Sequence, residues 1–164
     1  MNRLGAHNRD QIVTAVDAVT LAIPRGSIVG LVGESGCGKS TLGRIAAGLL
    51  RPSAGSVAFE GTRIDAGSSD LAPSAMLRVQ MVFQNPMASL NPRQRVVDIV
   101  SEAAIYHRLI DKADKMEFAA GLLAEVGLPR EALFRLPHQF SGGQRQRIGI
   151  ASALAVSPDF LICD

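Results

Sequence analysis

The sequence predicts an α/β fold, a doubly wound sheet with an inserted all-helical block. Three observations support this prediction. A short apolar run at residues 28–32 leads directly into a glycine-rich loop at residues 33–40. After about residue 85 the apolar residues recur at helical spacing. A second apolar run at residues 160–163 then returns to the pattern of a strand that is buried on both faces.

The first half of the chain contains most of the expected strands. Residues 15–23 have the pattern of a strand, with Val19, Leu21 and Ile23 alternating with the smaller Thr20 and Ala22. Residues 28–32 form a continuous apolar run and are also expected to be a strand. A helix is expected from about residue 39 to residue 50, ended by the turn residues that follow. Residues 56–59 and 79–83 are two further strand candidates. The segment 65–74, rich in Gly, Ser, Asp and Pro, is expected to be a loop.

The second half is expected to be helical at residues 96–109, 111–126 and 143–156. One face of the second helix is apolar, and its members recur at helical spacing: Met116, Ala119, Ala120, Leu123 and Val126. Gly127 follows at the position where a helix C-terminus favours a residue without Cβ strain.

Composition sets limits on the class of protein. The 164 residues are 47% apolar and 20% charged, which is typical of a globular domain. A net charge of +2 is too small to indicate a nucleic-acid partner. Cys37 and Cys163 form neither a disulfide framework nor a metal-ligand spacing, which fits a reducing cytosol. No apolar run approaches the roughly 18 residues of a membrane helix, so any membrane role is expected to come through a partner.

Residues 33–40, Gly-Glu-Ser-Gly-Cys-Gly-Lys-Ser, match the phosphate-loop pattern. Glycines let successive backbone N–H groups turn inward toward phosphate oxygens, and the following helix N-terminus favours anions. Lys39 can reach the β- and γ-phosphates of ATP, and the Ser40 hydroxyl can ligate Mg²⁺. The residues predicted to bind nucleotide here are Gly33, Ser35, Gly36, Cys37, Gly38, Lys39, Ser40 and Thr41.

A second motif, Ser141-Gly142-Gly143-Gln144, stands at the expected start of the last helix. A serine and two glycines at a helix N-terminus can form another anion site. The same serine can equally be a helix N-cap with no ligand. The motif alone leaves both interpretations open.

The order of these motifs resembles that of ABC ATPase domains. It runs from the phosphate loop to Gln84 at the end of a strand, then to residues 141–144, then to an apolar strand ending in Asp164. The resemblance covers about residues 13–164 and implies a P-loop NTPase (ABC ATPase) core with an inserted helical subdomain. Segments 84–93 and 138–151 are similar to the ATPase subunits of bacterial oligopeptide and dipeptide importers and their nickel-importing relatives.

The resemblance implies specific roles. Gln84 and Asp164 would act in catalysis, and together with Ser40 they would hold Mg²⁺. The signature motif formed by residues 141–144 would contact ATP bound to a second ABC subunit, in a homo- or heterodimer. The remaining partners implied are transmembrane permease subunits, which would place the chain in the cytoplasm, peripheral on the inner face of the membrane. The implied activity is ATP hydrolysis that energises peptide import.

The resemblance also implies a division of the chain and a departure from the family pattern. Residues 1–86 would form the ATP-binding core, 87–157 the helical subdomain and 158–164 the Walker B strand of the core. The family places a catalytic glutamate directly after the aspartate that corresponds to Asp164, the last residue here. We therefore expect a chain truncated at this aspartate, without the C-terminal part of the core, that binds ATP without turning it over. The alternative is a non-hydrolysing ABC module that acts by nucleotide binding and dimerisation.

The family also stacks an aromatic side chain on adenine from a loop before the first strand. No Phe, Tyr or Trp occurs before Phe59, and His7 is the only aromatic ring in that part of the chain. His7 is expected to be a solvated residue of the N-terminal segment, so adenine stacking is not predicted from this sequence.

Overall fold

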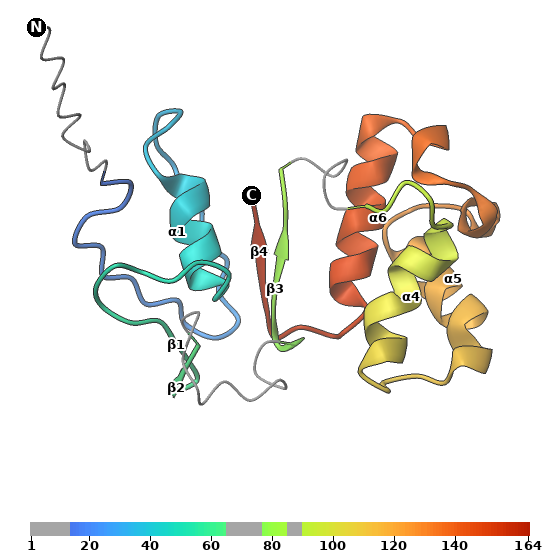
Figure 1. Cartoon of the computed structure of the whole chain (residues 1–164), viewed down its shortest axis with the longest axis horizontal. Coiled ribbons are helices and arrows are strands. Elements are labelled where there is room, and N and C mark those ends of the chain that lie inside the picture. Colours follow the sequence, from blue (N-terminus) through green and yellow to red (C-terminus); the bar gives the residue numbers. More distant parts are fainter. Residues whose placement is uncertain (1–13, 65–76, 85–89) are drawn as a thin grey trace, which may run out of the picture.

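The computed structural model describes residues 14–64, 77–84 and 90–164 (Figure 1). His7 and the expected loop at 65–74 lie outside these residues. The described elements, in chain order, are α1 (Lys39–Ala46), β1 (Ala58–Phe59), β2 (Thr62–Arg63), β3 (Val79–Val82), α4 (Val96–Tyr106), the 3₁₀ helix η1 (Lys112–Asp114), α5 (Lys115–Glu125), the 3₁₀ helices η2 (Arg130–Phe134) and η3 (Pro137–Gln139), α6 (Gly142–Leu154) and β4 (Phe160–Cys163).

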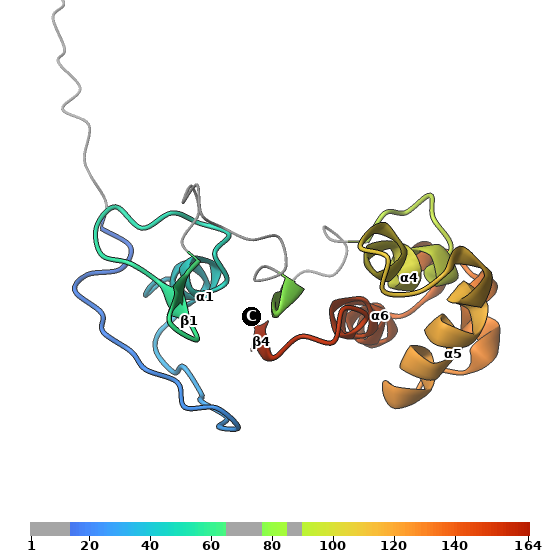
Figure 2. The ribbon, with the colours of Figure 1, turned by 90° about the horizontal axis from the view of Figure 1, so that it is seen from below.

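A parallel pair of strands, β3 and β4, lies at the centre of the molecule. Its register runs from Val79 opposite Phe160 to Val82 opposite Cys163. Helix α1 lies on one side of this pair and α6 on the other (Figures 1 and 2). Gly43 of α1 approaches the strands closely, because a Cβ there would lie 3.5 Å from Cγ2 of Ile162. The strands therefore separate α1, which follows the glycine-rich loop, from the helical block.

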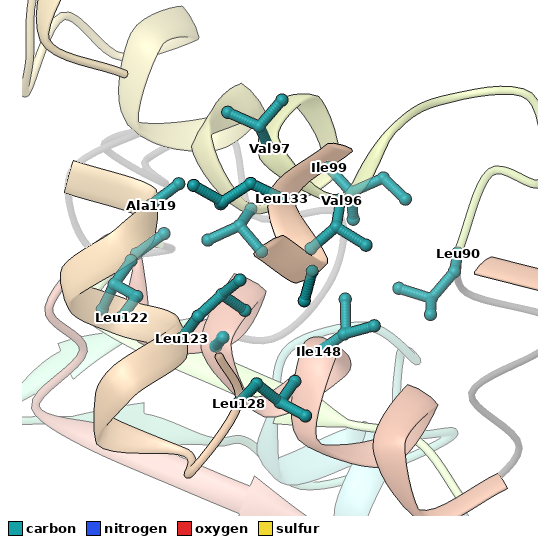
Figure 3. Packing of buried hydrophobic residues seen from close by; sticks show 14 of the residues in the cluster. Leu90, Val96, Val97, Ile99, Ala119, Leu122, Leu123, Leu128, Leu133 and Ile148 are labelled. Carbon is teal, nitrogen blue, oxygen red and sulfur yellow. The ribbon is translucent and has the colours of Figure 1, made fainter. Parts of the chain in front are cut away.

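The helical block has its own apolar core, formed by α4, α5, α6 and η2 (Figure 3). Leu123, Leu133 and Ile148 are fully buried there. The predicted apolar face of the second helix is confirmed: Ala119 and Leu123 are buried, and the other three members pack against the same core. Burial of these side chains is the main stabilising term for this part of the chain.

The predicted helices are confirmed, with shorter bounds at several ends. Gly127 has a φ of +68°, as expected for the residue after a helix C-terminus. Helix α1 ends at Ala46 and not near residue 50. The reason lies at Gly48, where φ is +71° and a Cβ would be 2.6 Å from the carbonyl oxygen of Ile64. The chain turns here against the segment that follows β2, and the turn ends the helix.

The strand predictions for residues 15–23 and 28–32 are wrong for this structure. Neither segment is a strand, and the expected burial of residues 28–32 is absent: Ile28 is 101% exposed and Val32 is 93% exposed. A strand exists only as part of a hydrogen-bonded ladder. Within the described residues β4 pairs with β3 alone, so the apolar run has no neighbour to pair with. The candidate at 56–59 is reduced to Ala58–Phe59, paired with β2 in a short antiparallel hairpin.

In the described part of the chain, no helix combines the length and the apolar character needed to cross a bilayer.

Candidate functional site

The glycine-rich loop closes onto the N-terminus of α1. Gly36 and Gly38 have φ values of +82° and +95°, in the left-handed region that side chains rarely adopt. A Cβ at Gly38 would lie 2.0 Å from the carbonyl oxygen of Ala15, so this position requires glycine for space as well as for conformation. Left-handed residues of this kind are part of the backbone conformation from which phosphate-binding nests are built.

The side chain of Lys39 lies across this loop. Its Nζ donates to the carbonyl oxygens of Gly33, at 2.8 Å, and Glu34, at 2.6 Å, and lies 3.6 Å from Sγ of Cys37. Within the described residues, the backbone N–H groups of residues 36, 38, 39 and 40 have no acceptor. Unpaired N–H groups and an ammonium at a helix N-terminus can donate to the oxygens of a phosphate chain, so the residues present fit a nucleoside triphosphate.

Ser40 and Asp164 meet beside this loop. Oγ of Ser40 donates to Oδ1 of Asp164 at 2.6 Å, in a partly buried position. Asp164 is held there because its backbone N–H donates to the carbonyl oxygen of Val82, continuing the β3–β4 ladder. A hydroxyl and a carboxylate are oxygen ligands of the kind that Mg²⁺ prefers. Among the described residues no group of three or more His, Cys, Asp or Glu could hold a metal by itself. A Mg²⁺ ion here would therefore depend on phosphate oxygens and water, as is usual for nucleotide-bound magnesium.

Gln84 follows β3 and is exposed. Because β3 and β4 are parallel, Gln84 and Asp164 leave the same edge of the sheet. The structure thus brings Gln84 to the edge where Ser40 and Asp164 meet. Residues 85–89, which continue the segment that resembles peptide importers, lie outside the described residues. Asn91 forms a turn by accepting the backbone N–H of Arg93 at its side-chain oxygen.

The second motif begins α6 with a reciprocal cap. Oγ of Ser141 accepts the backbone N–H of Gln144, and Oε1 of Gln144 accepts the backbone N–H of Ser141. The N-cap interpretation of Ser141 is confirmed, and its role as an anion ligand remains a prediction. The spacing Ser-x-x-Gln is a known signature of such a capping box, so the sequence carried this signal too. Gly142 and Gly143 lie exposed in the first turn.

One chain does not bring the two motifs together. Helices α1 and α6 lie on opposite sides of the β3–β4 pair (Figure 1). Within the described residues no hydrogen bond or ion pair joins residues 141–144 to the phosphate loop.

Sequence reasoning missed four charged residues at the opposite end of the strands. Arg78 donates through Nε to Asp159 at 2.6 Å and through a terminal nitrogen to Glu60. Arg25 pairs with the same two acids, at 3.2 Å from Glu60 and 4.0 Å from Asp159. The hydrogen bonds to Asp159 and then to Glu60 raise the pKa of Arg78. These residues are far apart in the sequence and follow no spacing, so no sequence pattern predicts them.

A cavity of about 200 Å³ lies between β3 and the helices α4 and α6. Phe83, Leu90 and Gly149 line it, together with further residues of β3 and α6.

Comparison with known proteins agrees with this geometry. The model of the ABC transporter family matches residues 16–164. The oligopeptide transport ATP-binding protein OppF of Bacillus subtilis (strain 168) is 49% identical over 154 residues, which are 93% of this chain and 50% of that protein. The oligopeptide transport ATP-binding protein AppF of the same organism is 46% identical over 153 residues, 93% of this chain and 46% of that protein. The chain thus spans about half the length of these curated relatives.

A solved structure shows the same arrangement. The dimeric ATP-binding cassette MJ0796, in a post-hydrolysis state bound to ADP and Pi, superposes with a TM-score of 0.82 at 28% identity. The superposition covers 99% of this chain and 69% of that one. The fold is therefore that of a P-loop NTPase of the ATP-binding-cassette type. The family model, the relatives and this superposition agree, and the chain belongs to the ABC transporter family.

Proposed function

We propose that this chain binds Mg²⁺-ATP and is the ATP-binding part of a subunit that energises a peptide importer. The observation that supports this most directly is the meeting of three groups at one place. These are the open phosphate loop around Lys39, the hydroxyl of Ser40 and the carboxylate of Asp164. The cationic group would bind the phosphates of ATP, and the hydroxyl and carboxylate would bind its Mg²⁺.

Loss of the Lys39 ammonium tests this proposal. Lys39→Ala removes a charge-assisted contact to phosphate worth about 1.5–3 kcal/mol, so ATP affinity should fall at least about tenfold. Titration with a fluorescently labelled ATP analogue measures it. Lys112→Ala, which removes an exposed lysine of η1 in the helical block, is the matched control and should bind as the unchanged chain does. Equal ATP affinity of the unchanged chain, Lys39→Ala and Lys112→Ala would contradict the proposed nucleotide site.

The hydrolytic reaction requires more than these groups. In the proposed role Gln84 senses the γ-phosphate at the edge where it leaves β3, and Asp164 holds Mg²⁺. The signature motif, residues 141–144, contacts ATP bound to a second subunit, because α6 and α1 lie on opposite sides of the strands (Figure 1). The dimeric state of the neighbouring cassette structure supports this arrangement.

The peptide-import role follows from the relatives, which are named oligopeptide transport ATP-binding proteins. In this role residues 1–86 and 158–164 form the nucleotide core and residues 87–157 form a helical subdomain that contacts transmembrane permease subunits. The separate apolar core of α4, α5 and α6 supports this division. The subunit would then lie in the cytoplasm on the inner face of the membrane. Co-purification of the chain with permease subunits expressed in the same cells tests this role. Failure of the chain to co-purify with permease complexes that are stable in detergent would contradict it.

A further inference from the structure

The position of Asp164 depends on how β4 is held. Within the described residues β4 has one neighbouring strand, β3, and four residue pairs set their register. The helices α1 and α6 lie on the two sides of this pair and support it by packing (Figure 1). A slip of one residue would turn the Asp164 side chain to the other face of the sheet, away from Ser40. The contact between Ser40 and Asp164 therefore depends on the register of the β3–β4 pair.

Arg78 holds the start of β4 through three contacts. Its backbone carbonyl accepts the N–H groups of both Asp159 and Phe160, each at 2.9 Å. Its Nε donates to Oδ2 of Asp159 at 2.6 Å. The backbone of Arg78 thus contacts both Asp159 and Phe160, and its side chain contacts Asp159 again, so a shift of β4 along its axis would disturb these contacts.

Arg78 is itself fixed by its surroundings. Its second guanidinium nitrogen donates to Glu60, and its guanidinium lies 5.0 Å from the centroid of the Phe59 ring. Arg25 pairs with Glu60 and with Asp159, which closes a ring of four alternating charges. A network with hydrogen-bonded geometry of this kind fixes orientation better than one isolated surface ion pair.

We propose that Arg78 is a positioning residue for nucleotide-bound Mg²⁺. By holding the start of β4, Arg78 fixes Asp164 beside Ser40. This inference rests on the proposed function. Asp164 lies five residue steps beyond Asp159 along the extended strand, roughly 16 Å, so Arg78 does not reach the nucleotide. It acts through the register of β4 alone.

The test separates magnesium binding from nucleotide binding. A fluorescently labelled ATP analogue is titrated once with excess Mg²⁺ and once with EDTA, and the ratio of the two affinities is the Mg²⁺ gain. Arg78→Met should reduce this gain at least about threefold while the affinity in EDTA changes less than about twofold. Arg130→Met is the matched control. It removes an ion pair of similar length, 2.7 Å to Glu117, at the surface of the helical block, and should leave both affinities unchanged.

Three further variants extend the test. Asp159→Asn removes the charge of this contact with little change in size and should also lower the Mg²⁺ gain, so it tests the inference even where Arg78→Met does not fold. The double variant should be no worse than either single one, because both changes act on one contact. Arg78→Lys, which keeps one charge but loses the two-sided donor geometry, should restore part of the gain.

The outcomes separate this inference from the proposed function. An unchanged Mg²⁺ gain, or an equal fall of both affinities, would show that the contacts of Arg78 with the start of β4 only stabilise the fold. Either result would overturn this inference but not the proposed function. No ATP binding by the unchanged chain, or no effect of Lys39→Ala, overturns the proposed function and this inference with it.

Discussion

The hydroxyl of Ser40 donates a 2.6 Å hydrogen bond to the carboxylate of Asp164, across 124 residues of sequence. The bond joins the first turn of α1 to the end of β4. It shows that two of the expected Mg²⁺ ligands, Ser40 and Asp164, lie side by side although they are far apart in the sequence.

Asp164→Asn tests the metal role of this contact. Asparagine keeps an acceptor for the Ser40 hydroxyl but removes the negative charge that attracts Mg²⁺. We expect the Mg²⁺ gain in ATP affinity to fall about tenfold, measured by titration with and without EDTA. Asp114→Asn, an exposed change in η1, is the control. A full Mg²⁺ gain in Asp164→Asn would mean that Asp164 is not a ligand.

The two cysteines report on the loop. Both are exposed, but Cys37 lies within the phosphate loop and Cys163 lies at the end of β4. Neighbouring side chains of a strand point to opposite faces, so Cys163 points away from the side on which Asp164 meets Ser40. We expect Mg²⁺-ATP to slow maleimide labelling of Cys37 and not of Cys163, measured by mass spectrometry. Equal protection at both sites, or at neither, would contradict a nucleotide in the loop.

The dimer is tested by mixing two damaged chains. Lys39→Ala alone and Ser141→Arg alone each damage both sites of a homodimer, if every site takes Lys39 from one subunit and Ser141 from the other. In a mixed dimer both lesions fall in one site, so the other keeps two intact partners. We expect ATP-dependent dimers only in the mixture, measured by size-exclusion chromatography and by crosslinking of the phosphate loop to residue 141 of the second chain. If Ser141 acts only as the cap of α6, mixing rescues nothing.

The helical block should be sensitive to loss of core volume. Leu133 is fully buried among α4, α5 and η2, so Leu133→Ala should lower the free energy of unfolding by about 2–5 kcal/mol. Its neighbour Phe134 is 55% exposed, and Phe134→Ala should cost much less. Urea unfolding followed by circular dichroism measures both. Equal losses would mean that η2 packs differently from the structure in Figure 3.

The exposed apolar run should make the chain associate. Ile28 and Val32 present almost their whole side chains to water, on unpaired backbone of a type that readily adds strands. We expect the isolated chain to form oligomers whose fraction rises with concentration, measured by light scattering. The double change Ile28→Lys and Val32→Lys should reduce this association by like-charge repulsion. A concentration-independent monomer in the unchanged chain would contradict it.

The helical half was predictable because its sequence period matches its surroundings in the fold. The strand at residues 160–163 was predicted in place, but its expected burial on both faces is wrong, since it is only partly buried and Cys163 is exposed. Residues 79–82 and 160–163 were both expected as strands and pair with each other. The strand prediction for residues 28–32 failed for a physical reason. An apolar run indicates that burial is favourable, but it does not indicate which neighbouring strand covers it. The phosphate loop was predicted from motif spacing, and Gln84 and Asp164 from the family resemblance, whereas Arg78 and its partners depend on tertiary contacts that spacing does not encode.

The uneven burial of the chain has a thermodynamic consequence for its ligand. The signature motif begins a helix anchored in a packed core, whereas the phosphate loop follows a segment, residues 14–37, in which nearly every residue is exposed. Exposed segments with few packed neighbours open locally more easily than a packed core, so we expect the loop to open and the measured affinity to be the intrinsic one multiplied by the fraction of chains in which the loop is closed. Calorimetry should show this as a favourable enthalpy opposed by entropy, with a heat-capacity change larger than the ligand's own contact area supplies.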